Sequence, residues 1–558
     1  MQNLAAIAGG LREIAALLRF AAAPKFKRLA YERAAEIVDT VGDELPTLIE
    51  QQRLLDLSGI GASLAAQIEQ LWNTGTSSYL ERLRRENPPG AGELVQVPGL
   101  TPRRIRLLSE RLGVDSVRAL RDACAKQLVR TLPGFGPKTE QRLELACEHW
   151  LAPKPSAGPP SILLSEGLAL AEALTEALPE RSSLAGEFRR GHELAPKLDL
   201  VVQGERAQAL EHLARLRRVL RVDRAAGVAH LGEGVTVRVH AAAPSRWGNV
   251  LVEATGNEAH VAAVHERARQ RGFDLSARDF ASEAELYDAV GLRWVPPELR
   301  DDDEALRTAE HESFDDLLDV AEIRGLVHCH TIYSDGKHSV LEMARAAEAL
   351  GMQYITITDH SPSAHYAGGV TLELLERQWD EIAAAQEQTQ IRILRGTESD
   401  ILRDGALDYP DKVLEQLDVV IASIHARHRL DRAAMTARLV RAMSLPFFKI
   451  WGHGLGRILN HRDPIDCDVP AVLDALATAG GAIELNADPY RLDLPPAWIP
   501  AARARNIPFV VSVDAHSTRG FGVLRYGVTM ARRGGLRADQ VLNTLGAADF
   551  IARVRPTR

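Results

Sequence analysis

The chain has 558 residues, of which 46% are hydrophobic and 25% charged, with a formal net charge of −8. One hydrophobic core cannot serve a chain of this length, so several domains are expected. The acidic balance excludes a uniformly basic nucleic-acid coat. Residues 1–157 carry +3 and the remainder −11, which fits a binding module joined to a metal-carboxylate module.

The four cysteines are widely spaced and form no C-x-x-C pair, which argues against a disulfide framework and a zinc ribbon. We therefore expect a reducing, cytoplasmic setting. Charged residues interrupt the apolar N-terminal stretch within its first twenty positions, so no signal peptide is predicted. Because no stretch approaches the roughly 20 apolar residues that span a bilayer, no membrane partner is expected.

Three glycine-containing turns, each followed by a helical pattern, recur within about eighty residues: Leu57–Gly61, Val97–Thr101 and Leu132–Lys138. Glycine allows a tight turn and close approach to a ligand, and the next helix presents free N–H groups that favour a phosphate. One such turn would more often be a structural corner. Three in series resemble the helix-hairpin-helix motif, although Thr101 replaces a usual glycine. The resemblance implies contacts with the DNA backbone by Gly59, Gly61, Gly99, Arg103, Gly134, Gly136 and Lys138.

A Pro-rich stretch, residues 151–160, predicts a linker. After it, Ala185–Glu193 reads AGEFRRGHE and Leu198–Val202 reads LDLVV. These segments resemble the palm of the family X DNA polymerases, with Arg189 and Arg190 in its conserved stretch. The resemblance covers almost the whole chain and points to the bacterial members that carry a polymerase-and-histidinol-phosphatase (PHP) domain.

This palm departs from the family pattern at its catalytic positions. The first Asp of the Asp-x-Asp pair falls on Lys197, and the third catalytic Asp falls on Arg238 in the predicted strand Val235–Val239, so only Asp199 remains. Glu187 takes the place of a nucleotide-binding serine. Two-metal nucleotidyl transfer needs carboxylates, and each cation at ~4 Å from a divalent ion would cost several kcal/mol. We predict a palm without polymerase activity, in which Asp199 pairs with Lys197 or Arg238.

Two further parts of the sequence also lead to predictions. Gln67 and Ser63 stand where lyase members of the family have lysines, so no 5′-deoxyribose-phosphate lyase activity is expected. The acidic stretches Glu298–Glu304 and Glu310–Asp316 predict a solvated connector.

From Ile323 onward, short apolar strands alternate with helical patterns, and seven such units predict a parallel barrel with its functional residues at the carboxyl ends of the strands. The predicted strands are Leu326–His330, Tyr354–His360, Ile391–Glu398, Val419–His425, Phe447–His453, Ala482–Asn486 and Phe509–His516. Six of the seven ends carry possible metal ligands. A single buried histidine is usually structural, but six ligand-bearing ends are not expected by chance.

The motifs HCHT, SDG, TDHS, GTESD, ASIH and VDAH resemble those of the PHP family, which implies three divalent ions. By that resemblance, the first is held by His328, His330, Glu398 and Asp514. The second is held by Glu398, His425 and His453, and the third by Asp335, His360 and His516. Imidazole and carboxylate ligands suit Mn²⁺, which we predict, with Zn²⁺ and Fe²⁺ as alternatives. Arg457 and Arg491 are the candidate phosphate-binding catalytic residues.

The predicted fold is multidomain α plus α/β. It comprises helical helix-hairpin-helix domains at 1–90 and 91–155, a degenerate nucleotidyltransferase-like palm at 160–245, a thumb at 246–312 and a (β/α)7 PHP barrel at 320–558.

The predicted function is that of a DNA-repair phosphoesterase acting as a 3′→5′ exonuclease on gapped, nicked or 3′-ended DNA; abasic-site cleavage or 3′-phosphate removal would use the same chemistry. The alternatives are an active gap-filling polymerase, a non-catalytic DNA-end binder and a small-molecule phosphatase.

Overall fold

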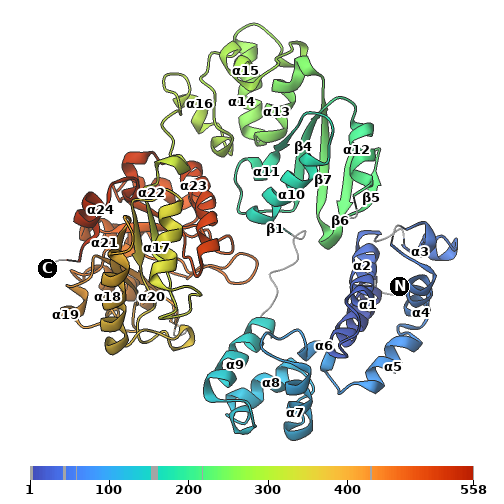
Figure 1. Ribbon diagram of the computed structural model, residues 1–558. Helices are drawn as coiled ribbons and strands as arrows, with labels where there is room; N and C mark the ends of the chain where they lie inside the picture. Colours follow the sequence, from blue (N-terminus) through green and yellow to red (C-terminus); the bar gives the residue numbers. More distant parts are fainter. Residues whose placement is uncertain are drawn as a thin grey trace. The chain divides into compact units, whose positions relative to one another are not determined.

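The structure, a computed structural model, describes residues 4–41, 45–57, 59–151, 161–216, 218–427 and 430–556 (Figure 1). Two compact units are present. The first contains Met1–Ile162, Ala173–Ser183 and Pro196–Ala241, and the second contains Leu163–Glu172, Leu184–Ala195 and Ala242–Arg558. Of the predicted linker, residues 152–160 lie outside the described part. No described helix is long and apolar enough to cross a membrane.

The N-terminal part of the first unit is helical. Its core contains Leu11, Ile14, Ile68, Leu108 and Leu120, each no more than 1% exposed, because apolar residues recur at helical spacing on the inner face of each helix. The helices are α1 (Leu4–Phe20), α2 (Lys25–Val41), α3 (Leu45–Glu50), α4 (Ala62–Thr74), α5 (Ser78–Glu86), α6 (Ala91–Leu94), α7 (Pro102–Leu112), α8 (Val117–Ala125) and α9 (Pro137–Leu151).

The three predicted glycine turns share one backbone conformation. Gly59, Gly99 and Gly134 have φ values of +100°, +87° and +84°, a region that side chains with a Cβ rarely adopt. Thr101, the departure in the second copy, is the N-cap of α7 and its side chain accepts a hydrogen bond from the Arg104 N–H. In the first copy the N-cap is Gly61, which has no side chain to make such a bond.

A five-stranded sheet in the order β2-β4-β7-β6-β5 lies in the segment predicted to be the palm. Strand β7 extends to Ala242, beyond the predicted end at Val239, and therefore includes His240. The elements are β1 (Ile162–Leu163), α10 (Leu164–Glu176), β2 (Ser182–Ala185), α11 (Gly186–Arg189), β3 (Leu194–Ala195), β4 (Lys197–Gln203), α12 (Arg206–Ala214), β5 (Val219–Asp223), β6 (Val228–Leu231) and β7 (Thr236–Ala242).

Helices α13 (Trp247–Thr255), α14 (Glu258–Gln270), α15 (Glu283–Ala289) and α16 (Glu304–Thr308) follow. Glu283 is 8% exposed and accepts hydrogen bonds from Arg189 at 2.7 and 2.8 Å and from Arg300 at 2.6 Å. Asp301 pairs with Arg190 at 2.6 Å. The prediction of a solvated connector at Glu298–Glu304 is therefore wrong at these positions, because Arg300 is fully buried and Asp301 is tied to the palm segment.

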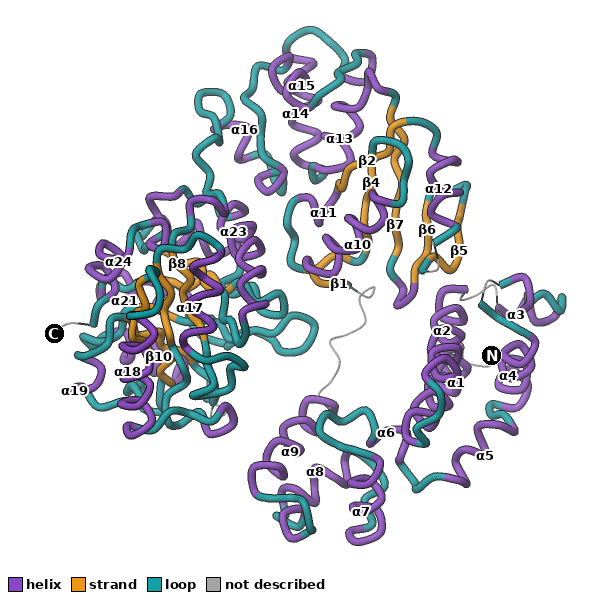
Figure 2. The backbone as a smooth tube through the Cα atoms, in the orientation of Figure 1, coloured by secondary structure: helices purple, strands orange, loops and turns teal. Residues whose placement is uncertain are grey.

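The predicted parallel barrel is confirmed. Seven parallel strands follow the order β14-β13-β12-β11-β10-β9-β8, and the edges meet where Ala515 N–H donates to His328 O at 3.0 Å and His330 N–H donates to Ala515 O at 2.9 Å. Figure 2 shows these strands surrounded by helices. The strands are β8 (Gly325–Cys329), β9 (Tyr354–Ile357), β10 (Arg392–Asp400), β11 (Val419–Ser423), β12 (Ile450–Trp451), β13 (Ala482–Asn486) and β14 (Phe509–Ser512).

Apolar side chains fill the barrel interior below the strand ends. Val327, Leu394, Ile421 and Val510 form one cluster that continues into Phe550, so polar side chains are confined to the opposite, carboxyl-terminal mouth. The surrounding helices are α17 (Val340–Ala349), α18 (Leu372–Gln386), α19 (Asp411–Leu414), α20 (Arg432–Met443), α21 (Val469–Ala479), α22 (Ile499–Arg503), α23 (Leu524–Arg533) and α24 (Ala547–Val554).

Candidate metal centre

Glu398, at the end of β10, is the centre of a side-chain cluster in the barrel mouth. It is 1% exposed. Its Oε1 atom lies 2.7 Å from His453 Nε2 and 3.2 Å from His425 Nε2, and its Oε2 atom lies 2.8 Å from His360 Nδ1. Each of these residues follows a different strand, so the parallel order of the barrel brings them together. One carboxylate therefore contacts imidazoles from three strands.

Two further groups adjoin Glu398. His330 Nε2 lies 3.3 Å from Asp514 Oδ1, and His328 Nε2 lies 3.7 Å from the same oxygen. On the solvent side, Asp335 lies 3.2 Å from His516 and 3.7 Å from His360. The ligand atoms of each group converge within 4.8 Å. The structure thus brings together all nine residues that the sequence singled out.

The buried polar atoms of the cluster fit a cation. Nε2 of His328, both ring nitrogens of His330, Nδ1 of His360 and Oε2 of Glu398 make no hydrogen bond of suitable geometry among the described residues, although the last two atoms lie 2.8 Å apart. An unsatisfied buried polar atom costs roughly 1–3 kcal/mol of stability. Several such atoms in one place would therefore destabilise the fold unless a ligand bound them. Neutral imidazoles and carboxylates are the donors that divalent transition metals take.

Two acidic residues that the sequence analysis missed hold the ligands in place. Glu484, in β13, accepts a hydrogen bond from His328 Nδ1 at 2.5 Å and another from the His453 N–H. Asp400 lies 3.0 Å from His425 Nδ1. Such carboxylates fix the orientation of a metal-binding imidazole. The signal was a glutamate between the apolar residues Ile483 and Leu485, in the one predicted strand whose end carries no proposed ligand.

The role of Glu484 in orienting the imidazoles can be tested by removing one of its two acceptor oxygens. His328 and His453 donate to different oxygens of Glu484. Glutamine has only one side-chain oxygen, so Glu484→Gln loses one of the two hydrogen bonds. We expect a 10- to 100-fold loss of metal affinity or of activity, measured by metal titration and by steady-state kinetics. A change of less than twofold in both quantities would contradict this role, and Asp400→Asn provides the parallel test at His425.

Charge in the cluster is strongly coupled. Burial alone would lower the pKa of His425, but the carboxylates of Glu398 and Asp400 outweigh it and raise that pKa to about 10. Burial would raise the pKa of Asp514, yet His328, His330 and Arg491 hold it well below its usual range. In the metal-free protein Asp514 is thus ionised and His425 carries a proton, which an incoming ion has to displace.

The two candidate arginines differ in their surroundings. Arg491 Nε lies 3.6 Å from Asp514 Oδ2, and its buried Nη1 has no hydrogen-bond partner among the described residues. Arg457 Nε donates to Arg491 O at 2.9 Å, and its Nη2 donates to Glu193 at 3.1 Å and to Leu492 O. Arg491 therefore has a free donor at the cluster, whereas Arg457 holds the backbone that carries Arg491.

Comparison with known proteins places this site in a family. The PHP domain model matches residues 327–486, and the DNA polymerase beta thumb model matches residues 250–301. The helix-hairpin-helix domain matches residues 3–77, and the SAM-like helix-hairpin-helix tandem matches residues 91–148. The DNA polymerase/3′-5′ exonuclease PolX of Bacillus subtilis (strain 168) is 31% identical over 97% of this chain and 97% of its own length.

The chain belongs to the PolX family. Probable phosphatases of Thermoanaerobacter sp. (strain X514) and of Caldanaerobacter subterraneus subsp. tengcongensis are 30% and 29% identical, each over 39% of this chain and over 89% and 85% of their own lengths. The helix-hairpin-helix and thumb matches, together with the PolX relationship, indicate that the chain binds DNA.

In this member of the PolX family, Asp199 lies beside a lysine and a histidine. Asp199 is 5% exposed, lies 3.4 Å from Lys197 Nζ, as predicted, and 2.9 Å from His240 Nε2. Arg238 is exposed. Burial would raise the pKa of Asp199, but His240, Lys197 and Arg238 lower it. The sequence analysis missed His240 because it ended the strand too early.

The other predicted palm residues have structural partners. Arg189 and Arg190 pair with Glu283 and Asp301, and Glu187 is half-buried in α11. Their contacts join the palm segment to the thumb helices.

Among the predicted DNA-contacting residues, Arg103 is exposed. Gly61 is the N-cap of α4, and Gly136 precedes α9. The side chain of Lys138 lies outside the described part of the structure. Neighbouring Arg104 donates to Gly99 O at 2.9 Å and to Gly134 O at 3.1 Å, so it joins the second and third turns.

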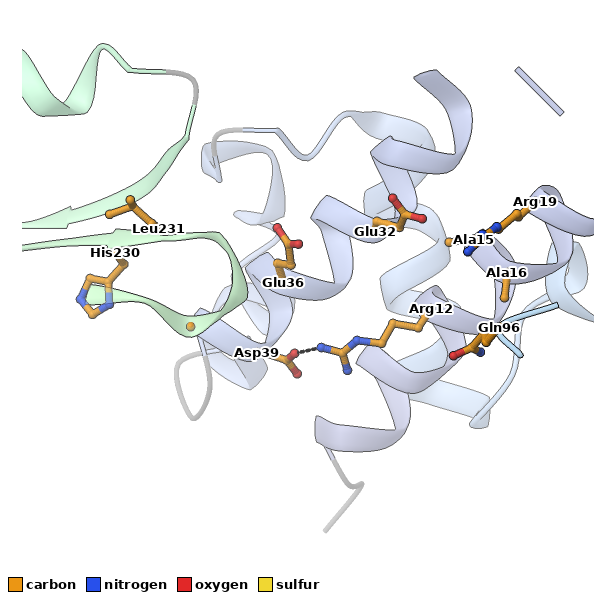
Figure 3. Close-up of a pocket in the computed structure, with 11 residues that line it drawn as sticks. Arg12, Ala15, Ala16, Arg19, Glu32, Glu36, Asp39, Gln96, His230 and Leu231 are labelled. Carbon is orange, nitrogen blue, oxygen red and sulfur yellow. Dashed lines mark hydrogen bonds and ion pairs between the residues drawn. The ribbon is translucent and has the colours of Figure 1, made fainter. Parts of the chain in front are cut away.

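A cavity of about 910 Å³ in the first unit is lined by α1, α2 and the end of β6 (Figure 3). Its charged residues are Arg12 and Arg19 against Glu32, Glu36 and Asp39, and Arg12 pairs with Asp39. With more acidic than basic side chains, this lining does not favour a phosphate, and we assign it no role.

Proposed function

We propose that the barrel is a metal-dependent DNA phosphodiesterase that acts as a 3′→5′ exonuclease in DNA repair. The observation that carries the proposal is the nine-residue cluster around Glu398, in a chain that also has helix-hairpin-helix modules. We propose Mn²⁺ as the ion, with Zn²⁺ or Fe²⁺ as alternatives. The substrates proposed are gapped, nicked or 3′-ended DNA. The B. subtilis relative, named a polymerase and 3′-5′ exonuclease, supports the proposal.

The residues have distinct roles in this mechanism. His328, His330, Glu398 and Asp514 would hold one ion, His425 and His453 with Glu398 a second, and Asp335, His360 and His516 a third. Bound ions supply a hydroxide near neutral pH and stabilise charge on phosphoryl oxygens. Arg491 binds a phosphate oxygen through its free Nη1 and orients the scissile group. Glu484 and Asp400 keep two imidazoles in position, and Arg457 positions Arg491.

We further propose that the palm does not add nucleotides. Lys197 and Arg238 stand where two carboxylates are needed, and Asp199 already pairs with Lys197 and His240. Abasic-site endonuclease and 3′-phosphatase activities would use the same barrel. An active polymerase, a non-catalytic DNA-end binder and a small-molecule phosphatase remain the competing functions, the last favoured by the probable phosphatases among the relatives.

One assay separates these functions. Labelled gapped duplex DNA is incubated with Mn²⁺, with and without nucleotides, and with the wild type, His328→Ala or the exposed control His311→Ala. We expect the wild type and His311→Ala to shorten the 3′ strand, and His328→Ala to leave it intact. Lengthening with nucleotides would support the polymerase, and binding without cleavage would support the end binder. Hydrolysis of a small phosphate ester without cleavage of DNA would support the phosphatase.

A further inference from the structure

Three large apolar side chains are exposed on the loops around the metal cluster. Ile332, Tyr366 and Tyr490 are 57%, 62% and 54% exposed and lie on the loops that follow β8, β9 and β13. A single exposed apolar side chain needs no explanation. Three on the rim of one polar site indicate a surface for a ligand with an apolar face.

Tyr366 lies closest to the cluster. Its ring centroid is 5.9 Å from that of His360 and 5.7 Å from that of His425. The turn that carries it is rigid: Gly369 N–H donates to Ala364 O at 3.1 Å, and Ala364 and Ala367 are buried beneath it. The fold therefore holds this ring against two ligand imidazoles and leaves most of it in solvent.

Positive charge accompanies the aromatic side chains. Arg491 offers its free Nη1, and Arg462 is exposed in the loop after β12. Aromatic rings combined with cations are the features by which proteins hold single-stranded nucleic acid, because bases stack on the rings and the cations attract phosphates.

The burial of the cluster restricts what can enter. His328, His330, Glu398 and His453 are no more than 2% exposed, so a scissile phosphate has to move into the barrel mouth. A single-stranded or frayed end can follow the phosphate without the loss of a base pair. The base of its terminal nucleotide then has no pairing partner.

We propose that Tyr366 stacks on the base of the unpaired 3′-terminal nucleotide, and that Tyr490 widens this platform from the opposite side of the mouth. The substrate class is then a single-stranded or frayed DNA 3′ end that carries a base. This inference rests on the proposed exonuclease function and adds to it how the leaving nucleotide is recognised.

The test compares two labelled single strands that differ only at the 3′ end, one with a thymidine residue and one with a tetrahydrofuran abasic residue. We expect the wild type to remove thymidine with a kcat/KM roughly 5- to 150-fold higher, the range of one base–aromatic stack. Tyr366→Ala should bring this ratio close to one, and Tyr366→Phe should retain it. Leu350→Ala, which removes a 57% exposed side chain of the same barrel, should leave the ratio unchanged.

A binding measurement separates this inference from the proposed function. A single strand with 2-aminopurine at its 3′ end is titrated with protein in EDTA. We expect the wild type and Tyr366→Phe to quench the 2-aminopurine fluorescence, and Tyr366→Ala not to quench it. Cleavage without a preference for the base, or equal quenching by wild type and Tyr366→Ala, would overturn the stacking role. Quenching that needs Tyr366, without cleavage of either strand in Mn²⁺, would instead reject the exonuclease and keep the base platform.

Discussion

Replacing Glu398 by glutamine is expected to abolish hydrolysis almost completely. The two oxygens of Glu398 face imidazoles from three strands, at 2.7, 2.8 and 3.2 Å. An amide keeps the shape but removes the negative charge that would offset the two proposed cations. Because stabilisation by metal ions is worth several kcal/mol in the transition state, we expect kcat/KM to fall roughly a thousandfold or more.

The measurement pairs nuclease kinetics with elemental analysis of bound Mn²⁺. We expect fewer ions per chain in Glu398→Gln than in the wild type. Glu376→Gln changes an exposed carboxylate on α18 of the same barrel and should alter neither quantity. If Glu398→Gln kept both its metal content and a tenth of the activity, Glu398 would not bridge two ions.

Replacing Glu283 by glutamine should destabilise the second unit. The carboxylate is buried with Arg189 and Arg300, and removal of one partner leaves buried charge uncompensated. Although burial would raise the pKa of Glu283, these arginines lower it from 4.5 to about 2. That difference corresponds to about 3 kcal/mol of stability at neutral pH, so we expect a loss of about this size in Glu283→Gln.

The pH dependence gives an independent check. The pKa of Glu283 is lower in the folded state, so the wild type binds fewer protons there than when unfolded. Its stabilisation is present above about pH 4.5 and disappears as the pH falls towards 2, whereas Glu283→Gln lacks this contribution at every pH. Urea unfolding can be followed by tryptophan fluorescence, to which Trp294 contributes; its Nε1 donates to Glu283 at 3.2 Å. Asp288→Asn, on the exposed face of α15, should unfold like the wild type.

The barrel and its ligands could be predicted because the information is local. Each strand is a short apolar run, and the ligand follows at its carboxyl end, where a parallel barrel collects side chains. The strand predicted at Phe447–His453 comprises only Ile450–Trp451 in the structure, yet His453 still lies against Glu398. Errors in strand length therefore leave the predicted site intact.

Long-range partners could not be predicted in the same way. Arg189 and Glu283 are 94 positions apart, and Arg190 and Asp301 are 111 apart. The resemblance placed both arginines in a polymerase site, and nothing local indicated that carboxylates of the thumb segment bind them. His240 was missed for a related reason, because its contact with Asp199 depends on where β7 ends.

The ligand set also determines what a truncated chain can do. The nine residues extend from His328 to His516 and follow six of the seven strands, so no fragment shorter than nearly the whole barrel contains a complete set. The free energy of ion binding therefore stabilises the folded barrel as a single unit. A chelator should lower the melting temperature of the barrel as a whole and make every strand, including those far from the mouth, more susceptible to proteolysis.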